Sequence, residues 1–404
     1  MTRLAVLSLH SSPLVQPGVG DSGGMNVYVR ELAASLAQAG VDTTVYVRRW
    51  ADGLADEVPV EPGFRVRHVD AGPPGLPKEA LPGVLDAFTE GVAAHLDRRP
   101  ADLLHANYWL SGVVGHRLKH RLDLPLVSTF HTLGLVKTAG GDAEPGGRSA
   151  AEAEIIGCSD LILANSAEER SQLVRLYDAA ADRIEIVPPG VEHAFFAPGD
   201  RGGARRAVDL PAAAPVLLFV GRIQPLKGLQ VAVGCLAASS HPDARLVVIG
   251  GPSGTDGEAE LARVLALADS LGVRSRLHLV DPQPHHLLST WYRAADVVVV
   301  PSRSESFGLV ALEAAACGIP VVAAAVGGLR TLVDHGVTGL LVERRDPADF
   351  AAAVDTVLGD PLLAARLGTA AAERARGYTW STAAARLRRI FADLTARDRV
   401  DCAA

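Results

Sequence analysis

The chain has 404 residues and a formal net charge of −7, with 48% hydrophobic and 21% charged residues, which is typical of a globular protein with two domains of ordinary size. The acidic balance and the lack of any basic run exclude the electrostatic footprint of a nucleic-acid-binding protein. Apolar runs are too short for a transmembrane helix, and polar residues interrupt the first one too soon for a signal peptide. We therefore expect a cytoplasmic protein with no integral membrane segment.

Short apolar runs alternate with amphipathic helical patterns through the first half of the chain. The predicted strands are residues 4–9, 43–47, 64–69, 103–105, 126–130, 161–164 and 184–187. The predicted helices are residues 25–38, 79–97, 110–121 and 168–177. Strands that alternate with helices indicate βαβ units and a parallel sheet.

The same rhythm restarts after residues 197–215, a Pro/Gly/Ala/Arg-rich stretch without strand or clear helix pattern that predicts a linker. Strands are predicted again at residues 216–220, 245–249, 276–280, 297–300, 319–323 and 340–342. We predict an α/β fold of two Rossmann-like domains facing each other across a cleft, residues 1–196 and 215–379. A helix over about residues 380–404 is expected to pack back on the first domain.

The four cysteines, Cys158, Cys235, Cys317 and Cys402, have no C-x-x-C spacing. Such scattered cysteines are typical of reduced thiols in a cytosolic protein. Cys158 and Cys317 lie in apolar helical patterns, where a small buried hydrophobic side chain is the expected role.

A glycine-rich loop runs from Gly18 to Gly24 into the first predicted helix. It contains a formal G-x-G-x-x-G, but about eight residues separate it from the strand, and the second strand ends in Arg48 and Arg49 rather than an acid. The spacing disfavours an NAD site and leaves an NADP-type site open. We favour a loop whose backbone approaches a ligand, with Asp21 and Asn26 reaching hydroxyl groups; a surface turn is the alternative.

Two cations and two carboxylates follow strands in the second half. Arg222 and Lys227 come just after residues 216–220, and Glu305 and Glu313 surround a helix start near Phe307. In parallel sheets ligands bind at the carboxyl ends of strands. The cations suit a diphosphate, which helix N–H groups also bind, and the carboxylates suit hydroxyl groups such as a ribose diol. An exposed basic turn and a structural ion pair are the alternatives.

His131 follows the strand at residues 126–130. A histidine there can hydrogen-bond a sugar hydroxyl or a developing charge. Judged from this residue alone, a purely structural role for His131 is equally plausible.

With these motifs assembled, the chain resembles the retaining glycosyltransferases of the GT-B fold, in the large family that includes sucrose-phosphate synthases. The motifs that carry the resemblance are G-R-I-Q-P-L-K-G (221–228), E-S-F-G-L-V-A-L-E (305–313), G-G-L (327–329) and V-T-G-L-L (337–341). The first half is most similar to the inositol-phosphate glycosyltransferases of mycothiol biosynthesis, through residues 10–29, 71–82, 105–112, 131–133 and 144–148.

The resemblance implies transfer of N-acetylglucosamine from UDP-GlcNAc to 1D-myo-inositol 3-phosphate, with retention at the anomeric carbon. It assigns acceptor binding to His10, Asp21, Ser22, Gly23, Gly24, Met25, Asn26, Lys78, Tyr108, Thr132 and Arg148. It assigns donor binding to Gln16, Pro17, Gly24, Arg222, Lys227, Gln283, Glu305, Phe307, Gly308, Leu309 and Glu313. Catalysis is expected to depend on His131, Arg222, Lys227 and Glu305.

Two departures from the close relatives concern substrate identity: Arg330 replaces their usual proline, and Gln283 their frequent arginine. Another nucleotide sugar or acceptor, such as fructose 6-phosphate or an aminocyclitol, therefore stays open, as does the NADP-dependent oxidoreductase. No Asp-x-Asp motif predicts a catalytic metal, so we expect no required cofactor besides the nucleotide sugar. A structural magnesium ion and a homodimer are compatible with the resemblance.

Overall fold

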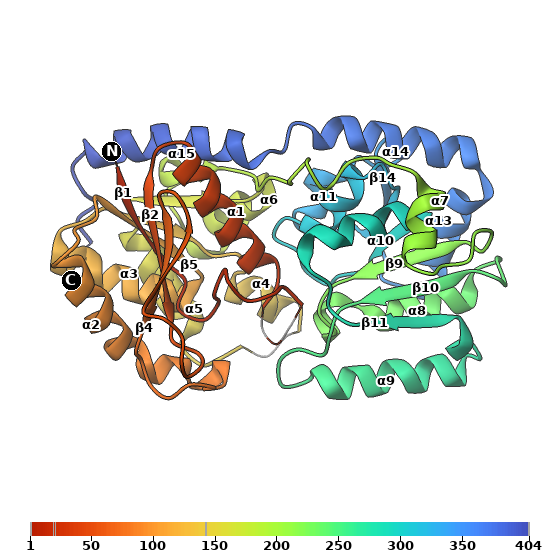
Figure 1. The fold of residues 1–404 in the computed structure, drawn as a ribbon, viewed down its shortest axis with the longest axis horizontal. Helices are drawn as coiled ribbons and strands as arrows, with labels where there is room; N and C mark the ends of the chain where they lie inside the picture. The colour runs from red at the N-terminus through yellow and green to blue at the C-terminus, as the bar shows by residue number, and fades with distance from the viewer. Residues whose placement is uncertain (1, 19, 21, 142–143, 403–404) are drawn as a thin grey trace. The chain divides into compact units, whose positions relative to one another are not determined.

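The computed structural model describes residues 2–18, 20, 22–141 and 144–402. The chain divides into two compact units (Figure 1). The first unit comprises residues 1–15, 25–188 and 380–404, and the second comprises residues 16–24 and 189–379. Each unit is an α/β layer structure with its own sheet.

The first unit has an eight-stranded sheet in the order β3-β4-β2-β1-β5-β6-β7-β8. All neighbours are parallel except β3 and β4, which are antiparallel. The strands are β1 (Arg3–Leu7), β2 (Asp42–Arg48), β3 (Glu57–Glu61), β4 (Phe64–Val69), β5 (Leu103–Asn107), β6 (Leu126–Thr129), β7 (Leu161–Ala164) and β8 (Ile184–Ile186).

Helices bury the two faces of this sheet, so its central strands are almost continuous apolar runs. The helices are α1 (Gly24–Gln38), η1 (Lys78–Val84), α2 (Leu85–Leu96), α3 (Trp109–Leu122), α4 (Gly134–Ala139), α5 (Arg148–Cys158), α6 (Ala167–Tyr177), η2 (Ala181–Arg183) and α15 (Trp380–Thr395). The late helix α15 joins the core around α1 and β1 through Trp380, Leu387 and Phe391 (Figure 1).

The second unit has a six-stranded, fully parallel sheet in the order β11-β10-β9-β12-β13-β14. Its strands are β9 (Val216–Val220), β10 (Arg245–Ile249), β11 (Leu277–Val280), β12 (Val297–Val300), β13 (Val321–Ala324) and β14 (Gly339–Val342). Its helices are α7 (Arg201–Ala207), η3 (Pro225–Lys227), α8 (Leu229–Ala238), α9 (Gly257–Ser270), η4 (Arg274–Arg276), η5 (His285–Leu287), α10 (Leu288–Ala294), α11 (Leu309–Ala316), α12 (Leu329–Leu332), α13 (Pro347–Gly359) and α14 (Pro361–Ala375).

The predicted alternation of strands and helices is confirmed in both units, and two elements differ from expectation. The stretch 197–215, predicted to lack a helix, contains α7, which Asp200 caps by accepting hydrogen bonds from the backbone N–H groups of Gly202 and Gly203. The short antiparallel edge strand β3 was not predicted. Its Pro59 is tolerated because an edge strand has one side without a ladder.

The expectation of four reduced cysteines is wrong for one pair. Cys158, at the end of α5, and Cys402, beyond α15, form a disulfide with their Cα atoms 5.0 Å apart. Because 244 residues separate them, sequence spacing could not indicate the pairing. Cys235 and Cys317 are free and buried, as expected for Cys317, and burial raises both thiol pKa values to about 12.

None of the helices in the described part of the chain is both long and apolar enough to cross a membrane.

Candidate functional site

Each sheet reverses its strand order at one place, where ligands of open α/β sheets bind beyond the carboxyl ends of the strands. In the first unit this switch point lies between β1 and β5, and in the second between β9 and β12. His10 follows β1 and Tyr108 follows β5, whereas Arg222 follows β9 and Glu305 follows β12. The topology therefore brings the predicted residues to one edge of each sheet, and each unit carries a half-site.

The first half-site begins with two residues in an unusual backbone conformation. Tyr108 has φ 74° and ψ 155°, a region that is essentially restricted to glycine, and His131 has φ 61°. Such conformations cost about 1–3 kcal/mol each and concentrate at functional sites. They occur directly after the adjacent strands β5 and β6, so the sheet aims both side chains at the same edge.

Four predicted acceptor residues lie together here. The Lys78 Nζ atom is 4.9 Å from the centroid of the Tyr108 ring, and the Arg148 guanidinium is 5.0 Å from it. Arg148 also donates to the Tyr108 hydroxyl at 3.3 Å and to the Thr132 backbone oxygen and Oγ1 at 2.7 and 3.1 Å. We call Lys78, Tyr108, Thr132 and Arg148 the phosphate cluster, since ammonium, phenol, hydroxyl and guanidinium all donate to phosphate oxygens.

Two carboxylates that sequence reasoning missed hold Arg148 in place. Its guanidinium, which is 1% exposed, pairs with Glu144 and with Glu152, the latter at 2.8 Å. Glu144 also pairs with Lys137, and Glu152 accepts from the Tyr177 hydroxyl and the Gly134 N–H. A buried cation needs such partners. With three cations and two carboxylates, the region keeps an excess of positive charge.

His131 is electrically neutral at physiological pH. Burial lowers its pKa to about 3, and the nearby His105 adds to the effect. Its Nε2 lies 2.9 Å from Asn107 Oδ1, so the tautomer with the proton on Nε2 leaves Nδ1 as an acceptor. His131 can therefore accept a hydrogen bond from a hydroxyl group, but it does not supply a positive charge.

His10 and Asn26 occupy the same edge of the first sheet. The His10 ring is 4.5 Å from the Tyr108 ring. The Asn26 side chain accepts from Ser11 Oγ at 2.6 Å and donates to the Ser12 backbone oxygen at 2.7 Å. Asn26 thus orders the loop after β1 in this structure, beside the site at which a hydroxyl ligand was predicted. Met25 is half-buried at the start of α1.

The glycine-rich loop belongs to the second unit up to Gly24. Gln16 donates to the Pro282 backbone oxygen at 2.8 Å. A Cβ added to Gly23 would lie 3.0 Å from the Arg222 Nε atom, so the loop passes directly over this guanidinium. Pro17 lies in a turn, and Ser22 is buried and accepts a hydrogen bond from the Gly18 N–H at 2.8 Å through its backbone oxygen. Asp21 lies outside the described residues.

In the second half-site an ion pair joins the motif at residues 221–228 to the motif at residues 305–313. Lys227 donates to Glu305, which also accepts from Ser302 Oγ at 3.1 Å. Arg222 lies 3.4 Å from Ser253 Oγ. The ammonium and guanidinium predicted to bind a diphosphate thus both lie at the switch point between β9 and β12.

The helix α11 starts at this switch point. Its N-cap is Gly308, with φ 103° and no side-chain cap, so the N-terminal N–H groups suit an anion. Phe307 before it is buried, and Leu309 after it is half-buried. Gly327 and Gly328 fit against the same segment, since a Cβ on Gly327 would lie 1.9 Å from the Glu305 backbone oxygen.

Glu313 has partners other than the arginine considered from the sequence. It bonds to His285 Nε2 at 2.7 Å and accepts from the Tyr292 hydroxyl at 2.7 Å. Burial and the Glu313 charge raise the pKa of Tyr292 well above its usual value. Gln283 donates to the backbone oxygen of Asp281 at 2.9 Å.

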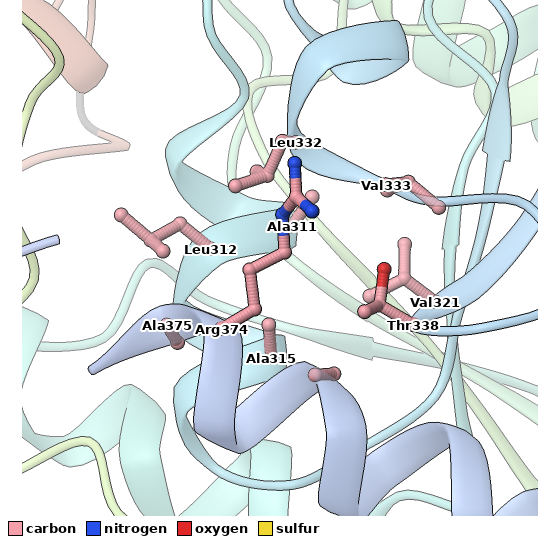
Figure 2. Close-up of a pocket in the computed structure, with 10 residues that line it drawn as sticks. Ala311, Leu312, Ala315, Val321, Leu332, Val333, Thr338, Arg374 and Ala375 are labelled. Atoms are coloured by element: carbon pink, nitrogen blue, oxygen red, sulfur yellow. The ribbon is translucent and has the colours of Figure 1, made fainter. Parts of the chain in front are cut away.

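A small, mainly apolar pocket lies behind α11 and contains none of the predicted site residues (Figure 2). Figure 2 shows the Arg374 side chain among the lining residues, and its guanidinium donates to the Thr331 backbone oxygen at 2.7 Å. The lining residues are Ala311, Leu312, Ala315, Val321, Leu332, Val333, Thr338, Ala371, Arg374 and Ala375.

The arginines that left an NADP site open are used within the fold. Arg48 donates to the backbone oxygens of Arg49 and Pro73, and Arg49 pairs with Asp56 and Asp70. Both side chains thus have structural roles at the carboxyl end of β2. They therefore give no support to an NADP-binding role for the glycine-rich loop.

Comparison with known proteins matches each half of the chain to a glycosyltransferase family model. Residues 22–195 match the family model "Glycosyltransferase Family 4", and residues 200–374 match "Glycosyl transferases group 1". The chain is 48% identical to D-inositol 3-phosphate glycosyltransferase 2 of Catenulispora acidiphila (95% of this chain, 93% of the relative) and 45% identical to D-inositol 3-phosphate glycosyltransferase of Thermobispora bispora (98% and 96%).

Among solved structures, sucrose-phosphate synthase from Thermosynechococcus elongatus superposes with a TM-score of 0.93 at 33% identity, covering 98% of this chain and 100% of the other. The sequence resemblance to GT-B enzymes is therefore confirmed, and the chain is a glycosyltransferase. It belongs to the GT-B glycosyltransferases, in the family of the D-inositol 3-phosphate glycosyltransferases that it matches along almost its whole length.

Proposed function

We propose that this enzyme transfers N-acetylglucosamine from UDP-GlcNAc to 1D-myo-inositol 3-phosphate with retention of anomeric configuration, as a step of mycothiol biosynthesis. The names of its relatives, which are 45–48% identical over almost the whole chain, support this acceptor class. The single observation that carries the proposal is the phosphate cluster, because a plain sugar acceptor would not need two cations beside a phenol and a hydroxyl.

The acceptor phosphate would bind where Lys78 and Arg148 lie on the Tyr108 ring. Arg148 is oriented by Glu144 and Glu152, and its other N–H groups donate to Tyr108 and Thr132. A phosphate would therefore replace one of these acceptors at a guanidinium whose position is already fixed. Thr132 supplies a hydroxyl, and His10 lies beside Tyr108, where the inositol ring would lie.

The donor diphosphate would bind Arg222, Lys227 and the N-terminus of α11. Negative charge grows on the diphosphate as it leaves, so fixed cations and N–H groups aimed at it lower the barrier. In this structure Glu305 holds Lys227 at the switch point, and we propose that the ammonium turns to the phosphate while Glu305 receives a sugar hydroxyl. Glu313 would bind the ribose diol in exchange for His285.

Retention is proposed to occur by front-face attack, in which the departing phosphate oxygen takes the proton of the acceptor hydroxyl. Glu144 and Glu152 are the carboxylates beside the phosphate cluster, and both are engaged by Arg148, so neither is placed to act as a nucleophile. His131, neutral above a pKa of about 3, would accept a hydrogen bond from the transferred sugar through Nδ1.

A UDP-release assay tests the proposal. Purified enzyme would be supplied with UDP-GlcNAc alone, with 1D-myo-inositol 3-phosphate, or with fructose 6-phosphate, and UDP would be quantified with time. The expected result is release that depends on inositol phosphate. Release that depends only on fructose 6-phosphate, or only with UDP-glucose as donor, would replace the proposed substrates while leaving the glycosyltransferase class in place.

Three further features belong to the same proposal. The reaction needs no metal, so its rate should be unchanged when magnesium is omitted. Both substrates are charged metabolites that do not cross membranes, which supports a cytoplasmic enzyme. A homodimer would be recognised by light scattering coupled to gel filtration.

A further inference from the structure

Four metal-binding side chains gather in the first unit, away from the phosphate cluster. They are His116, His120, Cys158 and Cys402, and their ligand atoms all lie within 4.8 Å of one another. None of them belongs to the residues that we assign to glycosyl transfer. Two imidazoles and two sulfurs are a ligand set typical of structural zinc.

The two histidines come from one face of α3. They are four residues apart, and side chains with that spacing lie one turn above each other on a helix. Their ring centroids are 4.9 Å apart. Cys158 ends the neighbouring helix α5, and its Sγ atom lies 3.4 Å from His120 Nε2.

The fourth ligand comes from the segment after α15. The Val400 N–H donates to Asp160 Oδ1 at 2.6 Å, and Arg399 pairs with Asp123 at 3.3 Å. These contacts place the Cys402 Sγ atom 3.1 Å from His120 Nε2 and 4.0 Å from His116 Nε2. Residues from three separate parts of the chain thus converge on one point.

The nitrogen–sulfur distances suit tetrahedral coordination, and the two sulfurs would move apart once the disulfide is reduced. Zinc–nitrogen bonds of about 2.0–2.1 Å and zinc–sulfur bonds of about 2.3 Å require ligand atoms roughly 3.3–3.8 Å apart, and the nitrogen–sulfur distances of 3.1, 3.4 and 4.0 Å bracket that range. His116 Nδ1 lies 3.5 Å from Glu154, so its Nε2 faces the sulfurs. A carboxylate on the other ring nitrogen is the usual second partner of a zinc-bound histidine.

The local charges also favour a divalent metal ion. Zinc with two thiolates and two neutral imidazoles has no net charge, which lowers the cost of partial burial. The nearby cation Lys119 is already paired with Asp160 at 2.8 Å.

We propose that His116, His120, Cys158 and Cys402 form a structural zinc site when the two cysteines are reduced. In this structure the cysteines form a disulfide, which cannot supply thiolates. A phosphine reductant converts the disulfide and one water molecule into two thiols and a phosphine oxide, and zinc then displaces the two thiol protons. Metal and disulfide are thus alternative ways to fasten the segment after α15 to α3 and α5.

The proposed zinc would stabilise the first unit and take no part in the transfer reaction. Tyr108 precedes α3 and Arg148 begins α5, and the helical rise places His120 about 18 Å from the former and Cys158 about 15 Å from the latter. The metal would hold the far ends of the two helices that begin at the phosphate cluster.

The test uses the full chain, reduced with a phosphine, stripped with a chelator and dialysed against zinc or cobalt(II). We expect one zinc per chain by mass spectrometry of metals, and a cobalt spectrum with thiolate charge-transfer bands and strong tetrahedral bands in the visible. His116→Ala and Cys402→Ser should lose both signals, and Glu154→Gln should weaken affinity by about 10- to 100-fold.

Cys235→Ser is the matched control, since it removes a buried thiol of the second unit and should bind metal like the wild type. Oxidised protein should bind none. The proposal is overturned if reduced wild-type protein binds less than stoichiometric zinc, if its cobalt form lacks thiolate bands, or if Cys402→Ser binds as the wild type does. The wild-type cobalt spectrum decides the matter even where a variant fails to fold.

Discussion

Replacing Lys78 with methionine separates phosphate recognition from catalysis. Lys78 Nζ lies 4.9 Å from the Tyr108 ring centroid, and methionine keeps much of the length and the contact with that ring while removing the charge. A hydrogen bond to a charged group contributes about 1.5–3 kcal/mol. Because Lys78 is half-buried, we take the loss of binding free energy to be about 1.5–2 kcal/mol. This corresponds to a roughly ten- to thirtyfold increase in the dissociation constant of the acceptor.

The expected result of Lys78→Met is therefore a ten- to thirtyfold rise in the KM for 1D-myo-inositol 3-phosphate, by the same conversion, with kcat little changed. Steady-state UDP release would be measured with the phosphorylated acceptor and with myo-inositol. The slow reaction with myo-inositol should stay unaffected. Arg98→Ala, which removes an exposed cation of the first unit, controls for net charge. Equal losses on both acceptors would refute the role of Lys78 in binding phosphate.

Three further predictions concern the second half-site and the core of the first unit. Lys227→Ala should lower kcat by about 10²–10³-fold, measured as UDP release under saturating substrates; an unchanged kcat would exclude Lys227 from stabilising the leaving group. Gly327→Ala should abolish donor binding in calorimetry, because its Cβ would lie 1.9 Å from the Glu305 backbone oxygen; wild-type affinity would contradict this packing. Burial lowers the pKa of His105 to about 4 in the folded protein, whereas its pKa in the unfolded chain is about 6.5. Its contribution to the free energy of unfolding is therefore complete above about pH 6.5 and is lost as the pH falls from about 6.5 to 4. Between pH 7 and 5 the loss amounts to roughly 2 kcal/mol, and urea denaturation of His105→Gln should show a correspondingly smaller pH dependence; an unaltered pH dependence would mean that His105 titrates normally.

The sheets were readable from the sequence because their strands are buried on both faces. Continuous apolar runs such as Val216–Val220 and Val297–Val300 have the bounds that the sequence predicted. The helix α7 was not readable, since two glycines and three arginines give it little apolar pattern. It forms because Asp200 caps it and because Arg205 is buried against Asp296, a contact between residues far apart in the chain.

The residue types of the site were predicted, but not all of their partners. The four-residue spacing of Arg148 and Glu152 was a readable signal for an ion pair along a helix, and it was overlooked. Glu144 lies before α5, so helical spacing could not indicate its pairing. The pairing of Glu313 with His285 and Tyr292 depends on how α10 and α11 pack, which local sequence does not specify. The same holds for Cys158 and Cys402, which only the position of the segment after α15 brings together.

The most direct test of the proposed reaction is the structure of its product. Enzyme, UDP-GlcNAc and equal amounts of 1D-myo-inositol 3-phosphate, fructose 6-phosphate and myo-inositol would be incubated together, and the products analysed by mass spectrometry and proton NMR. We predict one main product, N-acetylglucosaminyl inositol phosphate, with the small anomeric coupling of an α-linkage. A β-linked product would contradict retention, and a product built on either competing acceptor would contradict the role proposed for the phosphate cluster.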